Sequence, residues 1–499
     1  MNRLKKIIIS GLLALSVLLS FSSCKFPDTN SSFDSAFDYI DEKVIEIIDN
    51  NKSVPEKGSK SSFDKTDSES SNKTDSASKS KKTQSNKKTV NKSVKDVEAK
   101  VTVKEKIISD EKIEEPKTAN IESKSLIAAE HSALSESQYY QFSNLNAKEK
   151  RLYQKIVDAI KNSNSIVYLT EFGACEENVL KIFQMILADY PQFFYLSRNC
   201  MLMYNSFGNN VRALILLYCD GSVTDEFDKA MHLKSIADRN KINEQISEFL
   251  SKTNNALETI PSTYSDILKE KMIHDYIAEN VIYDTNAAEN IDEYQTTVPH
   301  SFDVYGAAVE GLAVCEGYAK LFQYMCYNVG INSGQVYGTS YGYEHMWNTV
   351  LINKKWYFVD VTWDDSGSIG YSYFNITEEK LSADHEADSS SISVPVCNCT
   401  DDSFINNFAV QIKDVNSAPL NYEKVFGNIK LLGEKRVFLY FENFKKDKNG
   451  YINAGLYANY IKYRFFNKKS EVYQFFKSNG VSFSGVIEKN NEFIVMTVI

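Results

Sequence analysis

The stretch VCEGYAKLFQYMCYNVG, residues 314–330, decides the fold of this chain. Its spacing predicts a helix that starts at Cys315 and stops at Gly330, a residue type that favours helix ends. The predicted helix buries one apolar face, formed by Ala319, Phe322, Cys326 and Val329. The dipole and free amides of a helix N-terminus lower the pKa of a thiol and favour the thiolate. Cys315 is therefore a candidate nucleophile, although an isolated cysteine would more often be a cap or a core residue.

A predicted hairpin downstream argues that Cys315 is not isolated. Two stretches of strand composition, Glu344–Ile352 and Trp356–Thr362, flank the dipeptide Asn353-Lys354. A two-residue turn between them makes His345 and Asp360 diagonal neighbours on one face of the sheet, roughly 7–8 Å apart between backbones. A three-residue turn would place them on opposite faces. The hypothesis of a Cys-His-Asp triad thus requires a turn of even length.

The three residues divide the tasks of nucleophilic catalysis. Cys315 would attack, His345 would hold its proton, and Asp360 would orient His345. An aspartate among aromatic residues needs a partner, and an imidazole N–H is a suitable one. Among the other histidines, His300 is the one rival because it precedes the cysteine segment, whereas His385 lies in an acidic stretch predicted to be a loop.

Three separated motifs resemble the transglutaminase-like superfamily: CEGYAKLF from Cys315, HMWNTV from His345, and WYFVDVTWDD around Asp360. The resemblance covers about Tyr264 to Asn375. It is closest to the bacterial exported branch, which is similar to a domain of some cytokinesis proteins. It implies an α+β fold with a papain-like, transglutaminase-like core, in which the Cys-bearing helix packs on an antiparallel sheet that carries the histidine and the aspartate.

The resemblance also implies a chemistry. Active members form a thioester through the cysteine and include peptidases, amidases and protein cross-linking transferases, while other members are inactive binding modules. We therefore expect an exported, membrane-anchored cysteine acyl-enzyme that acts on protein or peptide amide bonds by hydrolysis or by transglutaminase-type transfer. The alternative is a non-catalytic cell-surface binding module on the same scaffold. A second oxyanion donor is expected upstream of the nucleophile, and Tyr305 is the candidate.

The N-terminus resembles an export signal. Basic residues at Arg3, Lys5 and Lys6 precede an uncharged apolar stretch at 7–21, which is too short for a comfortable membrane span. Small residues before Cys24 resemble a bacterial lipoprotein processing site, where Cys24 becomes the lipidated N-terminus. Ordinary cleavage and an uncleaved anchor are the alternatives. We predict an extracytoplasmic protein that is lipid-anchored to a bacterial membrane.

Composition and periodicity divide the chain into segments. From about 51 to 124 the sequence is rich in Ser, Lys, Thr and Asp and almost free of aromatic residues, which predicts disorder. The predicted segments are a lipoprotein signal peptide at 1–24, a mostly disordered Ser/Lys-rich stalk at 25–134 with a short amphipathic helix at 33–49, an N-terminal α+β domain with a connecting helix at 135–258, the transglutaminase-like catalytic domain at 259–381, a loop at 382–403, and a C-terminal α+β domain of unknown role at 404–499.

Composition also bounds the partners. The 499 residues include 56 basic and 66 acidic side chains, a net charge of -10, so we expect no basic face for nucleic acid. No motif predicts a cofactor or a metal. The expected partners are a protein or peptide substrate, with cell-wall peptides as one candidate, and a membrane reached through lipidated Cys24. An exported thiol nucleophile must stay reduced, so the other cysteines should lie away from Cys315.

Overall fold

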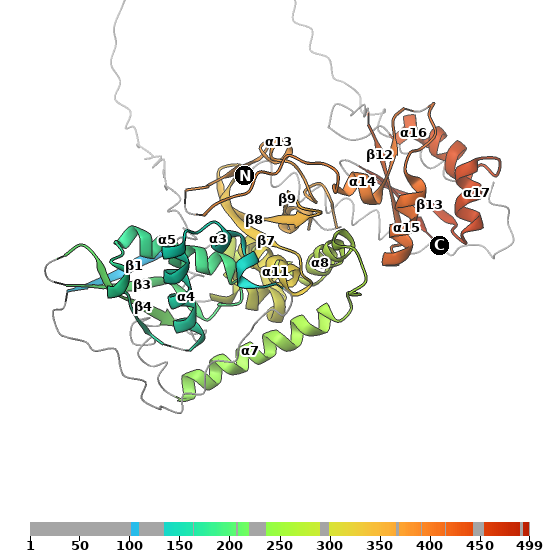
Figure 1. Cartoon of the computed structure of the whole chain (residues 1–499). Helices are drawn as coiled ribbons and strands as arrows, with labels where there is room; N and C mark the ends of the chain where they lie inside the picture. The colour runs from blue at the N-terminus through green and yellow to red at the C-terminus, as the bar shows by residue number, and fades with distance from the viewer. Residues whose placement is uncertain are drawn as a thin grey trace, which may run out of the picture. The chain divides into compact units, whose positions relative to one another are not determined.

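The computed structural model describes the second of two units into which the chain divides, 96–499 (Figure 1). The described residues are 101–108, 134–162, 164–205, 208–218, 236–289, 299–365, 369–390, 392–414, 416–442, 454–489 and 493–498. The predicted signal peptide at 1–24, with its lipidation site Cys24, and the predicted helix at 33–49 lie outside the described residues. Those predictions therefore stay predictions.

The N-terminal domain is a four-stranded sheet with helices packed on it (Figure 1). The strands are β2 (Ile166–Tyr168), β3 (Leu196–Tyr204) and β4 (Val211–Tyr218), with β1 (Thr102–Ile108) at the edge, in the order β1-β3-β4-β2. The helices are α4 (Ala147–Lys161) and α5 (Glu176–Asp189). At the start of α4, the Asn146 side chain accepts from the Glu149 amide and Glu149 accepts in return, the capping box that this spacing predicts.

Strand β1 corrects the prediction of a disordered stalk over 25–134. Residues Thr102–Ile108 pair in parallel with β3, and Val103 packs against the main hydrophobic core. The stalk prediction is therefore wrong for this segment. Its partner strand lies almost a hundred residues later in the sequence, and such a non-local pairing leaves only a weak local signal.

The domain predicted at 259–381 is built as the fold class predicts, with a helix packed on an antiparallel sheet. Helix α11 (Cys315–Asn328) lies against strands β7 (Ser333–Ser340) and β8 (Tyr343–Ile352), and helix α8 (Asp266–Asn280) packs on α11 (Figure 1). The predicted core positions Ala319, Phe322 and Cys326 are buried. Gly330 ends the helix with φ 87°, and the amides of Gly330 and Ile331 bond back to Tyr327 and Cys326 in a Schellman motif.

The hairpin turn has the length that the triad hypothesis requires. Strands β8 and β9 (Lys355–Val359) pair in register, with Ile352 opposite Lys355, across the two-residue turn Asn353-Lys354. Both turn residues have positive φ, 49° and 66°, as a type I′ turn demands. The predicted second strand ends early, however. Asp360 leaves the ladder and becomes the N-cap of the short helix α12 (Val361–Asp364), where its side chain accepts from the Trp363 amide.

A further correction concerns the segment 382–403, predicted to be a loop. Within it, β10 (His385–Ala387) forms an antiparallel edge strand on β7, so the sheet order is β10-β7-β8-β9. The close approach depends on Gly338 in β7. A Cβ atom at this position would lie 2.1 Å from the Glu386 carbonyl oxygen and 2.6 Å from the Trp347 ring.

The C-terminal domain is a second α+β layer. Its sheet has the order β11-β12-β14-β13, formed by β11 (Ala409–Ile412), β12 (Arg436–Phe441), β13 (Phe483–Lys489) and β14 (Ile494–Val498). Its helices include α14 (Phe404–Phe408), α15 (Tyr422–Leu432), α16 (Ala454–Ile461) and α17 (Glu471–Ser478). Tyr371 of the catalytic domain stacks on Phe404, with ring centroids 3.9 Å apart.

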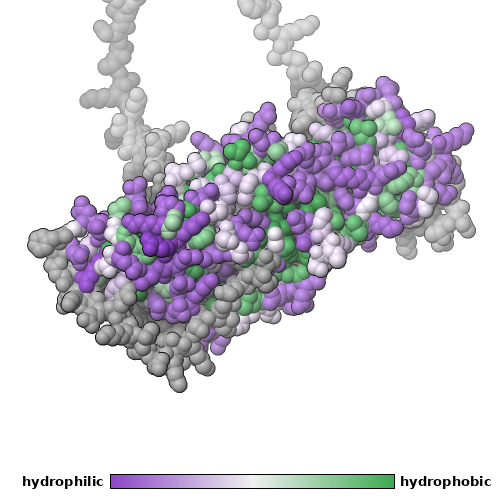
Figure 2. Space-filling model, in the orientation of Figure 1, coloured by the Kyte–Doolittle hydropathy of each residue, from purple (hydrophilic) through white to green (hydrophobic). Residues whose placement is uncertain are grey.

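Most of the surface in view is hydrophilic, with one hydrophobic region. In the face drawn in Figure 2 the described residues are mainly hydrophilic, and hydrophobic residues gather near the middle, over the region of α8 and α11. Along the described parts of the chain, none of the helices combines the length and the apolar character needed to span a membrane.

The close approach at Gly338 generates a stability prediction. Replacing Gly338 with alanine should destabilise the catalytic domain by about 1–3 kcal/mol, because the added methyl group meets backbone on one side and Trp347 on the other. The measurement is urea unfolding followed by tryptophan fluorescence, since all three tryptophans, Trp347, Trp356 and Trp363, lie in this domain.

The matched control for this prediction is Gly334→Ala in the same strand. A Cβ atom there meets only the Thr349 hydroxyl oxygen at 3.1 Å, a side-chain atom that can move. We expect a smaller loss of stability for this variant. Equal losses in the two variants would show that the contact with β10 is not the reason.

Candidate active site

The thiol of Cys315 lies at the first residue of α11. The residue before it, Val314, is the extended N-cap of the helix, and its amide donates to the Ser301 carbonyl oxygen. Within the described residues, the backbone N–H groups of Cys315 and Glu316 have no hydrogen-bond acceptor, as expected for the first turn of a helix. Cys315 is half-buried. The site therefore combines a reachable thiol with free amide donors beside it.

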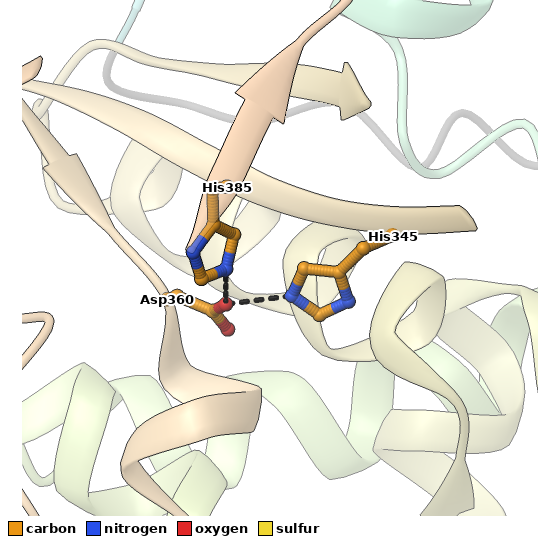
Figure 3. A group of neighbouring side chains, drawn as sticks. All are labelled: His345, Asp360 and His385. Atoms are coloured by element: carbon orange, nitrogen blue, oxygen red, sulfur yellow. Dashed lines mark hydrogen bonds and ion pairs between the residues drawn. The ribbon is translucent and has the colours of Figure 1, made fainter. Parts of the chain in front are cut away.

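His345 joins Cys315 to Asp360. Its Nε2–H donates to Asp360 Oδ2 at 2.6 Å, as Figure 3 shows. Cys315 lies close enough to this ring to interact with it electrostatically and to raise the pKa of the imidazole. Because Nε2 faces the carboxylate, Nδ1 is the nitrogen left for the thiol. The sequence-predicted residues Cys315, His345 and Asp360 are thus brought together in that order, from α11, β8 and the end of β9.

Electrostatics favour a charged histidine in this arrangement. Burial disfavours the imidazolium, but the neighbouring Asp360 and Cys315 outweigh it and raise the pKa of His345 to about 10. Burial also opposes ionisation of Asp360, yet its histidine partners lower the pKa of this carboxyl to about 2. Asp360 is only 1% exposed. A buried carboxylate beside an imidazolium is the pairing that stabilises a thiolate next to the same ring.

His385 is a site residue that the sequence reasoning missed. It is 5% exposed, and its Nε2 donates to Asp360 Oδ2 at 3.1 Å, so both histidines in Figure 3 point at one carboxylate oxygen. Its Nδ1 donates to Asp384 Oδ1 at 2.6 Å. The only local signal was a histidine within an acidic stretch, which is typical of a solvated loop. Its role becomes visible only once β10 pairs with β7.

The same three side chains are the group of potential metal ligands that the described residues contain. One nitrogen each from His345 and His385 and one oxygen of Asp360 lie within 4.8 Å of one another. Histidine nitrogen and carboxylate oxygen would suit zinc. The hydrogen bonds of the triad use the same atoms, however, so an ion here would displace the contact between His345 and Asp360.

Tyr305 is not placed to serve as the predicted oxyanion donor. Its hydroxyl donates to Glu248 Oε2 at 2.8 Å, and its amide donates to Asp303 Oδ1 at 2.8 Å. The rival histidine, His300, is similarly engaged, with Nδ1 on Asp303 Oδ2 at 2.9 Å and Nε2 on Gln245 at 3.2 Å. Both residues therefore belong to a cluster beside the start of α11 rather than to the triad.

Tyr283 faces the site instead. It lies on β5 (Ile282–Tyr283), which pairs in parallel with β6 (Leu312–Ala313), the two residues that lead toward Cys315. Burial raises the pKa of its phenol, and the nearby Cys315 and Asp360 raise it further. Among the described residues its hydroxyl has no hydrogen-bond partner. Tyr283 lies within the stretch ENVIYD, which the sequence reasoning had not connected to catalysis.

The sheet and the cysteine helix are fixed to each other by Asn348. This buried residue lies on β8, and its side-chain amide donates to the Ala319 carbonyl oxygen of α11 at 3.0 Å and to that of Gly334 at 3.3 Å. Trp347, beside it, stacks on His345 with ring centroids 5.8 Å apart. The strand that carries His345 and the helix that carries Cys315 are thus joined by a hydrogen bond about one helical turn from Cys315.

The state of the cysteines is consistent with a free thiol at Cys315. All six cysteines among the described residues are free, and Cys326 is buried about three turns along the same helix. Cys200 is buried, whereas Cys175 is exposed. Cys175 therefore offers an ordinary accessible thiol for comparison with Cys315.

A buried charge network supports the helix that follows Asp360. His274 on α8 lies fully buried between Asp275, at 3.2 Å from Nδ1, and Asp364 of α12, at 3.2 Å from Nε2. Burial disfavours its charged form, but the hydrogen bonds that it donates to these two carboxylates raise its pKa to about 9. Lys271, one turn before, contacts Asp275 at 2.5 Å and Glu434 of the C-terminal domain at 3.4 Å.

Comparison with protein families identifies the domain. Residues 254–361 match the model of the Transglutaminase-like superfamily, a range that contains all three predicted triad residues. The chain carries a transglutaminase-like domain. Two curated relatives are the Kyphoscoliosis peptidases of Mus musculus and Homo sapiens, 27% and 26% identical over 118 residues. The match covers 21% of this chain and 17% of each relative, so the chain spans only a small part of their length.

Two solved structures are similar to part of the chain. One is a "Putative Cysteine Protease" from Cytophaga hutchinsonii, with 21% identity over 23% of this chain and 37% of that protein, at a TM-score of 0.18. The other is a TGase, with 21% identity over 34% of this chain and 45% of that protein, at a TM-score of 0.22.

The network at His274 generates a pH prediction. The folded-state pKa of about 9 lies above the unfolded value of about 6.5, so the imidazolium stabilises the fold fully below pH 6.5. This contribution is lost as the pH rises from about 6.5 to about 9. The stability advantage of the wild type over His274→Gln should therefore shrink by about 3 kcal/mol across that window.

Urea unfolding at several pH values, followed by tryptophan fluorescence, measures this difference. Groups that titrate in the same window without interacting with His274 are common to both proteins and cancel in the comparison, whereas Glu270, whose pKa burial raises to about 8 against the lowering effect of His274, contributes to the difference. A difference that stays constant from pH 6.5 to 9 would mean that His274 is not charged in the folded protein.

Proposed function

We propose that the transglutaminase-like domain is a cysteine acyl-enzyme that acts on protein or peptide amide bonds. The single observation that carries this proposal is the position of His345, which hydrogen-bonds the carboxylate of Asp360 and interacts electrostatically with the thiol of Cys315. This is the arrangement that nucleophilic acyl transfer by a thiol requires. The names of the relatives, a peptidase and a transglutaminase among them, agree with amide chemistry.

The proposed reaction has two halves. The Cys315 thiolate attacks the carbonyl carbon of an amide, and His345 gives its proton to the departing amine as the carbon–nitrogen bond breaks, which leaves a thioester on Cys315. A second nucleophile, water or an amine, then gives a proton to His345 and attacks the thioester. Its product leaves as an acid or a new amide, and the thiolate–imidazolium pair returns. Asp360 stabilises the charged ring of His345 throughout.

Three donors are available for the oxyanion of this reaction: two backbone N–H groups and one side-chain hydroxyl. The backbone N–H groups of Cys315 and Glu316 have no acceptor among the described residues and lie at the positive end of α11. The Tyr283 hydroxyl, which faces Cys315, is the side-chain candidate in place of Tyr305. A phenol keeps its proton near neutral pH and can donate it to a developing negative charge.

The second nucleophile decides between a hydrolase and a transferase. Incubation of the full chain with a labelled primary amine and a glutamine-containing protein separates the two. Incorporation of the amine would identify transfer, and release of free acid without incorporation would identify hydrolysis. Cys315→Ala is the negative control for both products. A variant that keeps its full cellular role without the thiol would favour the non-catalytic binding module.

We further propose that the protein is exported and lipid-anchored, because small residues precede Cys24 after an uncharged apolar stretch. Protein or peptide substrates outside the cytoplasm, with cell-wall peptides among them, follow from this location. The segment between Cys24 and the first described strand would provide the distance between membrane and domain.

The triad proposal predicts the reactivity of Cys315. Iodoacetamide should alkylate Cys315 at pH 6 at least about tenfold faster than the exposed Cys175, because the imidazolium of His345 stabilises the thiolate. The rate is measured at each cysteine by peptide mass spectrometry. In His345→Ala the preference should disappear, while Cys175 serves as an internal reference. Equal rates at the two cysteines in the wild type would rule out an activated thiol.

The export proposal predicts a lipid on Cys24. Bacteria grown with an alkyne-tagged fatty acid should incorporate the tag into the wild-type protein and into Cys315→Ala, but not into Cys24→Ser, because only a thiol at that position can be lipidated. The membrane fraction should lose the Cys24→Ser protein in parallel. Unchanged tagging of Cys24→Ser would refute the lipoprotein proposal and leave the triad proposal untouched.

A further inference from the structure

We propose that His385 is a positioning residue that holds Asp360 in the orientation His345 needs. The inference rests on the proposed function of the Cys315–His345–Asp360 triad and adds a fourth member to it. His385 touches neither the thiol nor the proposed substrate position. It acts through Asp360, whose Oδ2 atom it shares with His345 (Figure 3).

Three donors fix the carboxylate of Asp360. Oδ1 accepts from the Trp363 amide at 3.1 Å, and Oδ2 accepts from His345 at 2.6 Å and from His385 at 3.1 Å. Without His385, only His345 would hold Oδ2, and the two groups could rotate together away from Cys315. A second donor from another strand fixes Oδ2 independently of the histidine that it orients.

His385 is itself held firmly enough to serve this purpose. Its Nδ1 bonds Asp384 Oδ1 at 2.6 Å, and the other oxygen of Asp384 accepts from the Tyr373 hydroxyl at 2.6 Å. The imidazole ring packs between Trp347 and Trp363, with centroids 5.0 Å and 5.1 Å away. The strand that carries it lies on β7, where only glycine fits at position 338.

Both ring nitrogens of His385 face hydrogen-bond acceptors. Each of its nitrogens faces a carboxylate oxygen, which can only accept, so both hydrogen bonds form when both nitrogens carry a hydrogen. The titratable groups that face this part of the site from other elements are Cys315 on α11, His345 on β8, Tyr283 on β5, Asp364 on α12 and Tyr373. The two ring nitrogens of His385 thus face the carboxylates of Asp384 and Asp360.

A pair of amide substitutions separates positioning from packing. In His385→Gln, the side-chain amide nitrogen can reach the place of Nε2 and still donate to Asp360. In His385→Asn, the amide nitrogen falls near the place of Nδ1 and can donate only to Asp384. Both variants keep a polar side chain of similar character in the same pocket. His385→Leu removes both hydrogen bonds and is the third variant.

The readout is the rate of Cys315 alkylation by iodoacetamide from pH 5 to 9, measured on the full chain with Cys175 as the internal reference. We expect His385→Gln to stay within about threefold of the wild type. His385→Asn and His385→Leu should react about tenfold more slowly at pH 6, with the rise in rate moved to higher pH, because a loosened Asp360 stabilises the thiolate–imidazolium pair less well.

Several results would overturn the inference. A His385→Asn profile that superimposes on that of the wild type would show that the Asp360 contact is dispensable. Equal loss in Gln, Asn and Leu variants, accompanied by equal loss of thermal stability, would show a packing role only. Should the leucine variant fail to fold, the contrast between the two amide variants still decides. If wild-type Cys315 shows no dependence on His345, the triad proposal fails first and this inference falls with it.

Discussion

The hydrogen bond between His345 Nε2 and Asp360 Oδ2 is the constraint on which the rest of the catalytic domain depends. It joins residues that are 15 positions apart, His345 on β8 and Asp360 directly after β9, and a single turn determines the register of these two strands. A slip of one residue would move His345 to the other face of the sheet. The turn Asn353-Lys354 prevents that slip by accepting positive φ at both positions. Asp360 must also leave its strand at the right point, which the short helix α12 ensures.

The hairpin register and the extent of α11 could be predicted because local interactions determine them. A two-residue turn sets the pairing of Ile352 with Lys355, and helix-ending glycine sets the length of α11. Cys315 could be assigned to a helix N-terminus from the residues around it alone. The one local error was at Asp360, predicted to continue its strand. There, the benefit of capping α12 through the Trp363 amide outweighs the strand propensity of the residues that follow.

The placement of His385, of strand β1 and of Tyr305 could not be predicted because it depends on contacts between distant segments. His385 lies in a stretch whose composition is that of a loop, and its place beside Asp360 exists only because β10 pairs with β7, some 45 residues earlier. The edge strand β1 pairs with a partner almost a hundred residues later. The surroundings of Tyr305 could not be predicted for a related reason, because its hydroxyl donates a hydrogen bond to Glu248 on α7 (Ile236–Leu257). Loop-closure entropy makes such pairings depend on the whole core rather than on their own sequence.

The buried side chains of the site form one chain of alternating acceptors and donors: Asp384, His385, Asp360, His345 and Cys315. An isolated buried carboxylate would be costly, and burial does oppose the ionisation of Asp360. Two imidazole donors reverse that cost and keep its pKa low. The consequence is that the charge on Asp360 is set by groups from β8 and β10 together, while only His345 of these two histidines interacts with the thiol. The acyl chemistry would thus rely on a strand that never contacts the nucleophile.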